Sequence, residues 1–171
     1  MKDKIYFLAL MTALATSLYF IEMLLPKPLP FIKIGFSNII ILLLVYNRIF
    51  RFAIFTTLLK SVIGSFATGT LLTPTFLLSF SGGLSSCLFM IIFTLLLQNL
   101  SIVGLSIIGA FSHLLMQLLV VKYLIIKSNN ILLLYPIIAV LSIITGIITG
   151  MVAAYFNKSL DLRSLYAKSC T

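Results

Sequence analysis

Long apolar stretches, interrupted by single polar residues, fill most of the chain. Six windows carry one charged side chain or none, and they cover residues 5–25, 34–47, 52–72, 75–97, 100–121 and 131–156. A transmembrane helix needs about 20 mostly apolar residues, so the helix of the short second window is expected to begin earlier. No window alternates apolar and polar residues as a transmembrane strand does. The pattern predicts an all-α bundle of six transmembrane helices with short loops over residues 1–157, followed by a short basic tail at 158–171.

Composition supports the same class. Apolar residues make up 61% of the chain and charged residues 9%, and the mean hydropathy is +1.24. Soluble domains carry about a quarter charged residues, so an integral membrane protein is indicated. The net charge of +9 does not point to nucleic acid, because the basic residues lie singly at the ends of the predicted helices and form no patch. We therefore expect membrane lipid, and no nucleic acid, as a partner.

Lysine and arginine residues predict how the chain is oriented. With a cytoplasmic N-terminus, the inner side collects Lys2, Lys4, Arg48, Arg51, Lys158, Arg163 and Lys168. The outer side then holds Lys27, Lys33, Lys122 and Lys127. Cytoplasmic loops are richer in these residues, so both termini are predicted to be cytoplasmic. The first apolar stretch continues to Leu25, which favours a retained helix over a cleaved signal peptide.

The segment 22–38, between the first two predicted helices, concentrates unusual polar chemistry. It holds Glu22, Lys33 and Asn38 together with three of the five prolines. Polar residues are rare within membranes and usually functional there, so these three are predicted to form the outer part of a ligand site. The prolines prevent the helix from continuing, which predicts a shaped outer lid. The alternative for Glu22 is an interfacial carboxylate that faces headgroup water.

Lys60 falls near the middle of the third predicted helix. A lone ammonium at that depth costs about 3 kcal/mol or more unless it is paired or hydrated. A role in a ligand cavity or in a buried ion pair is therefore predicted. The alternative is a lysine that extends from a shifted helix to the interface.

His113 and Gln117 are four residues apart and share one face of the fifth predicted helix. They are predicted to line the ligand site at the depth of Lys60, and interhelical hydrogen bonding is the alternative. A single histidine is weak evidence for a metal. Ser79 begins a stripe of small residues on the fourth predicted helix and is included among the predicted ligand-binding residues.

Pairs of small residues also mark the first and last predicted helices. Ala9 and Ala13 are four residues apart, as are Gly146 and Gly150. Small residues at this spacing let helices approach closely. Ordinary packing within the bundle is one explanation of each pair, and contact with a partner helix is the other.

Several chemistries are excluded or disfavoured. The chain lacks the glycine-rich loop that binds ATP phosphates, so it cannot energise transport alone. Its acidic residues are only Asp3, Glu22 and Asp161, too scattered to hold magnesium for diphosphate chemistry. Cys87 and Cys170 form no disulfide framework or metal pair. No nucleophile motif is present, and we predict that the chain is not an enzyme and carries no cofactor or metal.

Four motifs in order carry a family resemblance over residues 5–156. They are Glu22 with Pro26, Pro28 and Pro30; the run 32–38, Ile-Lys-Ile-Gly-Phe-Ser-Asn; the run 78–86, Leu-Ser-Phe-Ser-Gly-Gly-Leu-Ser-Ser; and the run 104–113, ending at Gln117. The chain resembles the Gx transporter family, also labelled heptaprenyl diphosphate synthase component I, and is similar to substrate-binding S components of energy-coupling-factor (ECF) transporters. Where the family tends to have arginine in the third helix and asparagine after the histidine, this chain has Lys60 and Leu114.

The resemblance implies a bacterial cytoplasmic-membrane protein that binds a small ligand for uptake with a separate ATPase module. The predicted ligand-binding residues are Glu22, Lys33, Asn38, Lys60, Ser79, His113 and Gln117. By the same resemblance, Ala9 and Ala13 would dock on an ECF-type transmembrane coupling subunit. The alternative function is an accessory membrane subunit in prenyl diphosphate or quinone metabolism, or in flavin- and quinone-linked electron export, with a lipid-like ligand. Proton-coupled secondary transport is a third hypothesis, which the absence of an internal repeat disfavours.

Overall fold

The structure, a computed structural model, describes residues 2–24, 35–97, 99–126, 133–159 and 162–168. Within these ranges every regular element is a helix and none is a strand, as predicted. The helices are α1 (Lys2–Leu24), α2 (Asn38–Tyr46), α3 (Phe50–Ala67), α4 (Pro74–Leu96), α5 (Ile102–Val120), the π-helix η1 (Val121–Ile126), α6 (Tyr135–Ser159) and α7 (Leu162–Lys168).

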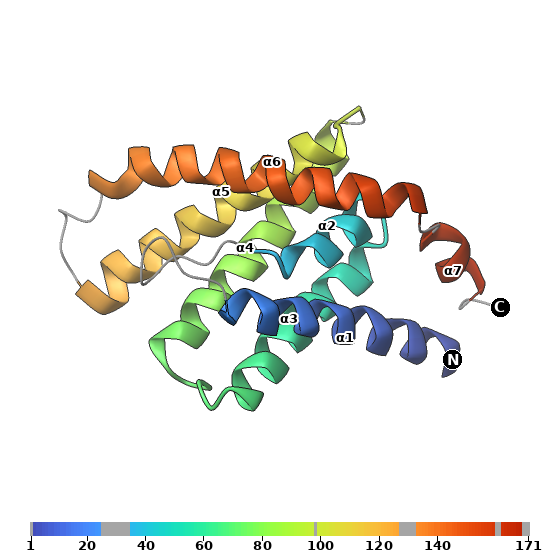
Figure 1. The fold of residues 1–171 in the computed structure, drawn as a ribbon, viewed down its shortest axis with the longest axis horizontal. Helices are drawn as coiled ribbons and strands as arrows, with labels where there is room; N and C mark the ends of the chain where they lie inside the picture. Colours follow the sequence, from blue (N-terminus) through green and yellow to red (C-terminus); the bar gives the residue numbers. More distant parts are fainter. Residues whose placement is uncertain (1, 25–34, 98, 127–132, 160–161, 169–171) are drawn as a thin grey trace.

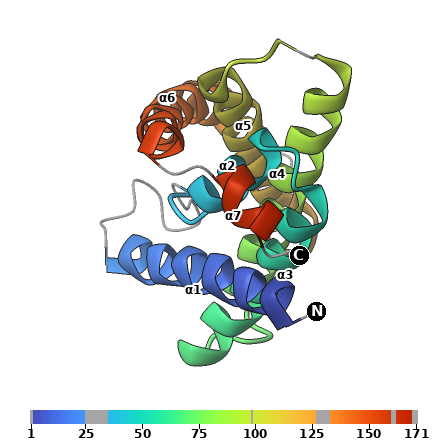
Figure 2. The ribbon, with the colours of Figure 1, turned by 90° about the vertical axis from the view of Figure 1, so that its right-hand side faces the viewer.

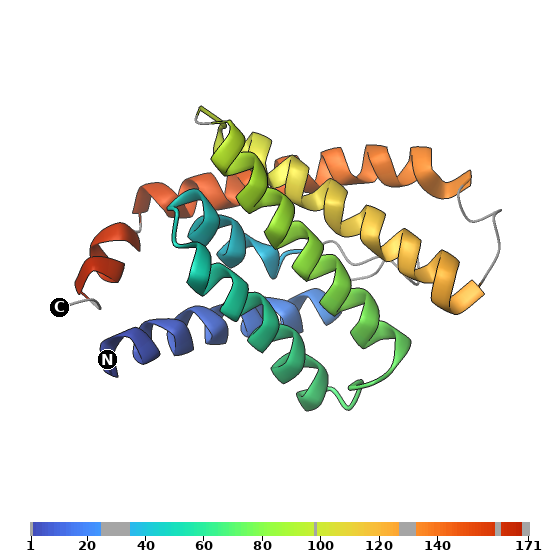
Figure 3. The same cartoon turned by 180° about the vertical axis from the view of Figure 1, so that it is seen from behind.

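Five helices in the described part of the chain are long and apolar enough to cross a membrane. They are α1, α3, α4, α6 and the continuous stretch Ile102–Leu124 that contains α5. The 23 residues of α1 or α4 extend about 35 Å, which exceeds the roughly 30 Å of hydrocarbon in a bilayer. All five run between the same two ends of the bundle (Figures 1 and 3). The chain is thus built as a multi-pass membrane protein.

The second predicted transmembrane helix differs from the other five. In the described residues it appears as α2, whose nine residues extend only about 14 Å. The helix begins after a tight turn in which Gly35 has φ +87° and the Asn38 N–H donates to the Gly35 carbonyl at 2.8 Å. A helix of this length does not cross the hydrocarbon alone, so six membrane passages stay a prediction.

The position of α2 at the centre of the bundle explains its uninterrupted apolar sequence. Figure 2 shows α2 surrounded by the longer helices, and it contacts α1, α3, α4, α5 and α6. Ile41, Leu44 and Val45 are fully buried. A helix that is buried on all sides needs no polar face, and its sequence therefore resembles that of a lipid-exposed span.

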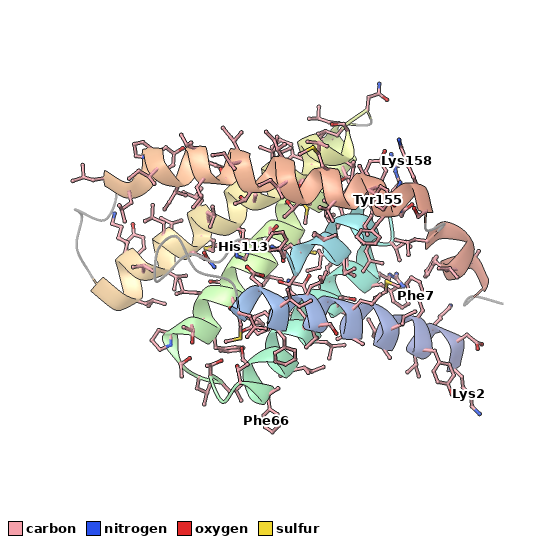
Figure 4. The ribbon with its side chains drawn as sticks, viewed as in Figure 1. Lys2, Phe7, Phe66, His113, Tyr155 and Lys158 are labelled. Atoms are coloured by element: carbon pink, nitrogen blue, oxygen red, sulfur yellow. The ribbon has the colours of Figure 1, made fainter. Side chains whose placement is uncertain are left out.

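One end of the bundle gathers the start of α1, the helix α7 and the α2–α3 turn (Figure 1). Lys2 and Lys158 both lie at this end (Figure 4), as expected if it faces one side of the membrane. The predicted tail includes α7, which packs back on the bundle: the Tyr166 ring lies 5.4 Å from that of Phe52, and Leu162 is buried. The domain boundary at residue 157 stays a prediction.

Candidate functional site

Glu22 is the charged residue that α1 buries in the described part of the chain. It lies in the last turn of the helix and is 5% exposed. Its carboxylate accepts hydrogen bonds from the Gly35 N–H and, at 3.4 Å, from both the N–H and the hydroxyl of Ser37. The left-handed conformation of Gly35 is readily adopted only by glycine. Glu22 therefore holds the turn that starts α2, and the interfacial alternative, with a carboxylate facing water, does not fit its burial.

Lys60 of α3 reaches the same turn from the other side. It is 3% exposed, and its ammonium donates to the Ser37 hydroxyl at 3.0 Å and to the Asn38 side-chain oxygen at 2.6 Å. Ser37 thus connects the ammonium to the Glu22 carboxylate through one hydroxyl. This arrangement places two opposite charges in one buried network, which reduces the cost of burying either. Lys60 is thus bonded inside the bundle.

His113 of α5 continues the network beyond Asn38. The Asn38 amide nitrogen lies 3.2 Å from His113 Nδ1, and Gln117 Nε2 lies 3.1 Å from His113 Nε2. Gln117 Nε2 also donates to the Leu78 carbonyl at 3.4 Å. Figure 4 shows His113 near the middle of the bundle, far from the charged end marked by Lys2 and Lys158. Residues from α1, α2, α3 and α5 therefore form one connected polar chain.

The hydrogen-bond directions in this chain define the tautomer of His113. Lys60 can only donate, so the oxygen of the Asn38 amide faces it and the amide nitrogen faces His113. Nδ1 must then accept, and the proton of the neutral ring lies on Nε2. The best partner for that N–H is the carbonyl oxygen of Gln117, which has no hydrogen-bond partner as placed. Turning the amide by half a rotation supplies this oxygen and gives up the long bond to Leu78.

The network lines a small cavity, which we name the Glu22 cavity. Its volume is about 10 Å³, and its lining residues are Tyr19, Glu22, Gly35, Ser37, Lys60, Ser61, Ser79 and His113. This volume is at the lower limit for one water molecule. In this conformation the polar groups are bonded to one another, so a ligand would have to separate them to enter.

Glycines allow two ring side chains to reach the cavity. A Cβ at Gly82 of α4 would lie 3.0 Å from His113 Cε1, and a Cβ at Gly64 of α3 would lie 2.8 Å from the Tyr19 ring. The glycine at position 82 of α4 thus leaves room for the His113 ring. By contrast, Gly146 and Gly150 face the backbone of α5 at Ile107 and Val103, which is ordinary helix packing.

The structure brings together most of the predicted ligand-binding residues. Glu22, Asn38, Lys60, His113 and Gln117 belong to one network, and Ser79 lines the Glu22 cavity. Lys33 and the three prolines lie outside the described residues.

Two predicted residues lie away from the network, and two residues of the network were not predicted from the sequence. Ala9 and Ala13 lie on the exposed side of α1 and take no part in the network. Sequence reasoning missed Ser37 and Tyr19, because serine and tyrosine are common in apolar helices and their partners are distant in sequence. Cys87 is buried, and no group of three or more His, Cys, Asp or Glu side chains among the described residues could hold a metal.

Fold and site together define a multi-pass helical membrane protein with a buried, charge-containing polar network at its centre. The family model for heptaprenyl diphosphate synthase component I matches residues 11–156, and the chain belongs to this family. The predicted family is thereby confirmed, whereas the similarity to ECF S components stays a prediction. No curated protein and no solved structure matches the chain.

Proposed function

We propose that the protein is a membrane-embedded substrate-binding component that binds a small polar ligand in the Glu22 cavity. In this proposal it has the six-passage architecture of an ECF S component, with α2 in the second passage. It lies in the bacterial cytoplasmic membrane with both termini inside. Uptake would depend on a separate ATPase module, because the chain has no nucleotide-binding loop.

One observation carries this proposal: the convergence of buried polar side chains from separate helices on one cavity. Glu22 and Lys60 line it from α1 and α3, and Ser79 and His113 line it from α4 and α5. Ionisable groups in a membrane protein are expensive to bury and mark substrate or ion pathways. Packing alone would be served by apolar side chains at all four positions, so ligand binding is the better reason for this set.

The exposed side of α1 supports a docking role for Ala9 and Ala13. Both are exposed, and Ser17 continues the same stripe one turn later. Small side chains permit close approach of a second helix. We expect Ala13→Leu to leave the folded protein as stable as wild type but to abolish co-purification of a coupling subunit. The change Leu10→Ala, on a neighbouring exposed position, is the control. Equal loss in both variants, or in neither, would contradict docking through this stripe.

Native mass spectrometry of the gently extracted protein tests the ligand site. We expect a small polar molecule to be retained by wild type and by Lys158→Ala, whose lysine is exposed, and to be lost from Lys60→Ala. Retention at the same occupancy in all three proteins would overturn the proposal, because the ammonium of Lys60 would then contribute nothing to binding.

A second candidate function rests on a different feature, an apolar groove between α4, α5 and α6. The groove has a volume of about 480 Å³, and Phe89, Phe93 and Phe111 are among its mostly apolar lining residues. Such a groove suits an isoprenoid chain, which favours an accessory role in prenyl diphosphate or quinone metabolism, or in flavin- and quinone-linked electron export. Retention of a quinone or prenyl lipid, with no transporter subunits, would support this function and contradict the first.

A further inference from the structure

A second cavity with polar lining residues borders the Glu22 cavity at His113. We name it the Ser86 cavity. It is lined by residues of α2, α4, α5 and α6, has a volume of about 20 Å³, and shares Gly35 and His113 with the Glu22 cavity. Its polar lining includes the hydroxyls of Ser86, Ser106 and Thr149. None of these hydroxyls was singled out as a site by the sequence or assigned a role in the proposed ligand network.

Ser86 is the residue that makes this cavity informative. It is 1% exposed, and its hydroxyl has no hydrogen-bond partner in the described part of the chain. A buried hydroxyl without a partner costs about 1–3 kcal/mol. Ser106 and Thr149, by contrast, are bonded to each other at 2.8 Å, yet each hydroxyl oxygen has further capacity to accept.

The size and the polarity of the Ser86 cavity both match a single water molecule. A buried water needs about 10–15 Å³ or more and two to four polar partners, and the 20 Å³ cavity offers Ser86, Asn38 and the Ser106–Thr149 pair. No charged side chain is among the residues that line it. The occupant is therefore expected to be neutral, and the remaining lining residues, such as Met90 and Leu42, exclude a larger polar molecule.

We propose that the Ser86 cavity is a binding site for one water molecule. The water donates to or accepts from the Ser86 hydroxyl, and it links Asn38 to the Ser106–Thr149 pair. The polar chain that starts at Glu22 on α1 then continues to α6, through every helix that surrounds α2. This inference does not depend on the proposed transport function, since an internal water serves the network whether or not a ligand binds.

Radiolytic hydroxyl-radical footprinting tests the proposal directly. Ionising radiation converts an internal water into a radical that oxidises the side chain beside it. Met90 lines the Ser86 cavity and is 1% exposed, whereas Met11 is 4% exposed and lines neither polar cavity. If the water is present, Met90 should be oxidised several times faster than Met11, and exchange into ¹⁸O-water should place ¹⁸O on Met90.

The variant Ser86→Val provides the matched test of the site itself, because it fills the cavity and removes the hydroxyl. Oxidation of Met90 should then fall to the rate of Met11. Oxidation of Met90 no faster than that of Met11 in wild type would overturn the proposal. So would a fast rate that Ser86→Val leaves unchanged, because the water would then lie elsewhere. If Ser86→Val does not fold, the comparison of the two methionines in wild type still decides the question.

Discussion

Removing the ammonium of Lys60 should uncover how strongly it is coupled to Glu22 through Ser37. The change Lys60→Met keeps an unbranched side chain of similar length and eliminates the charge. It breaks the bonds of 3.0 Å to the Ser37 hydroxyl and 2.6 Å to the Asn38 oxygen. The Glu22 carboxylate, 5% exposed, is left in the core without the cation that balances its charge.

The magnitude follows from burial and from the bonds that remain. Removing one partner of a buried ion pair in direct contact costs about 3–5 kcal/mol, and here the Ser37 hydroxyl lies between the two charged groups. Glu22 keeps its bonds to the Gly35 N–H and to Ser37, so we expect the lower end, about 3 kcal/mol. The second change, Glu22→Gln, removes the uncompensated charge and should restore part of the loss. The double variant should therefore be more stable than the sum of the single variants predicts, by about 1–3 kcal/mol.

Equilibrium unfolding in mixed micelles, followed by circular dichroism, measures these free energies for wild type, both single variants and the double variant. The exposed residue Lys158 provides the control, and Lys158→Met should change the free energy of unfolding by less than about 0.5 kcal/mol. Strict additivity of the two single variants would show that Glu22 and Lys60 do not interact through Ser37.

Three further predictions concern the geometry around His113 and Gly35. Gly82→Ala should destabilise the protein by about 1–3 kcal/mol, because the new Cβ would lie 3.0 Å from His113. The control Gly83→Ala, whose Cβ would have its nearest contact at 3.5 Å, should be tolerated. Equal thermal stabilities of the two variants would contradict this packing. The ¹⁵N chemical shifts of His113 should report a neutral ring protonated on Nε2, and a proton on Nδ1 would contradict the hydrogen-bond directions. Gly35→Ala and Gly69→Ala both place alanine at positive φ, at about 1–2 kcal/mol each, but only the change at Gly35 should weaken ligand retention in native mass spectrometry. Equal ligand retention in the Gly35→Ala and Gly69→Ala variants would mean that the turn at Gly35 does not shape the ligand site.

The apolar windows predicted the five long helices well. A helix that crosses a membrane has about 20 residues with almost no charge, and such a stretch is visible in the sequence. The second window was harder to interpret. A stretch of 10–14 apolar residues is typical of a buried core helix as well as of part of a span, and α2 is surrounded by protein. Sequence also gave no indication that α7 would pack on the bundle through Tyr166 and Leu162, since a seven-residue helix carries little periodic pattern.

The polar site was predictable to the extent that charge is rare in membrane helices. Glu22, Lys60 and His113 stand out from apolar surroundings, and they do meet. The connections between them were not predictable, because they pass through Ser37 and Asn38 and depend on how the turn at residue 35 is held. The sequence does not show that the Ser86 hydroxyl lies in a cavity without a partner, since serine hydroxyls in helices often bond to a backbone carbonyl of their own helix.

A high-resolution structure of the natively extracted protein would show whether the buried polar network is a ligand site. If the network binds a ligand, density for it should lie within hydrogen-bond distance of Lys60 Nζ, with the Asn38–His113 contact opened and the Glu22 cavity enlarged well beyond 10 Å³. A retained molecule in the apolar groove between α4, α5 and α6, with the contacts of Asn38 to Lys60 and His113 unchanged, would contradict ligand binding by the network.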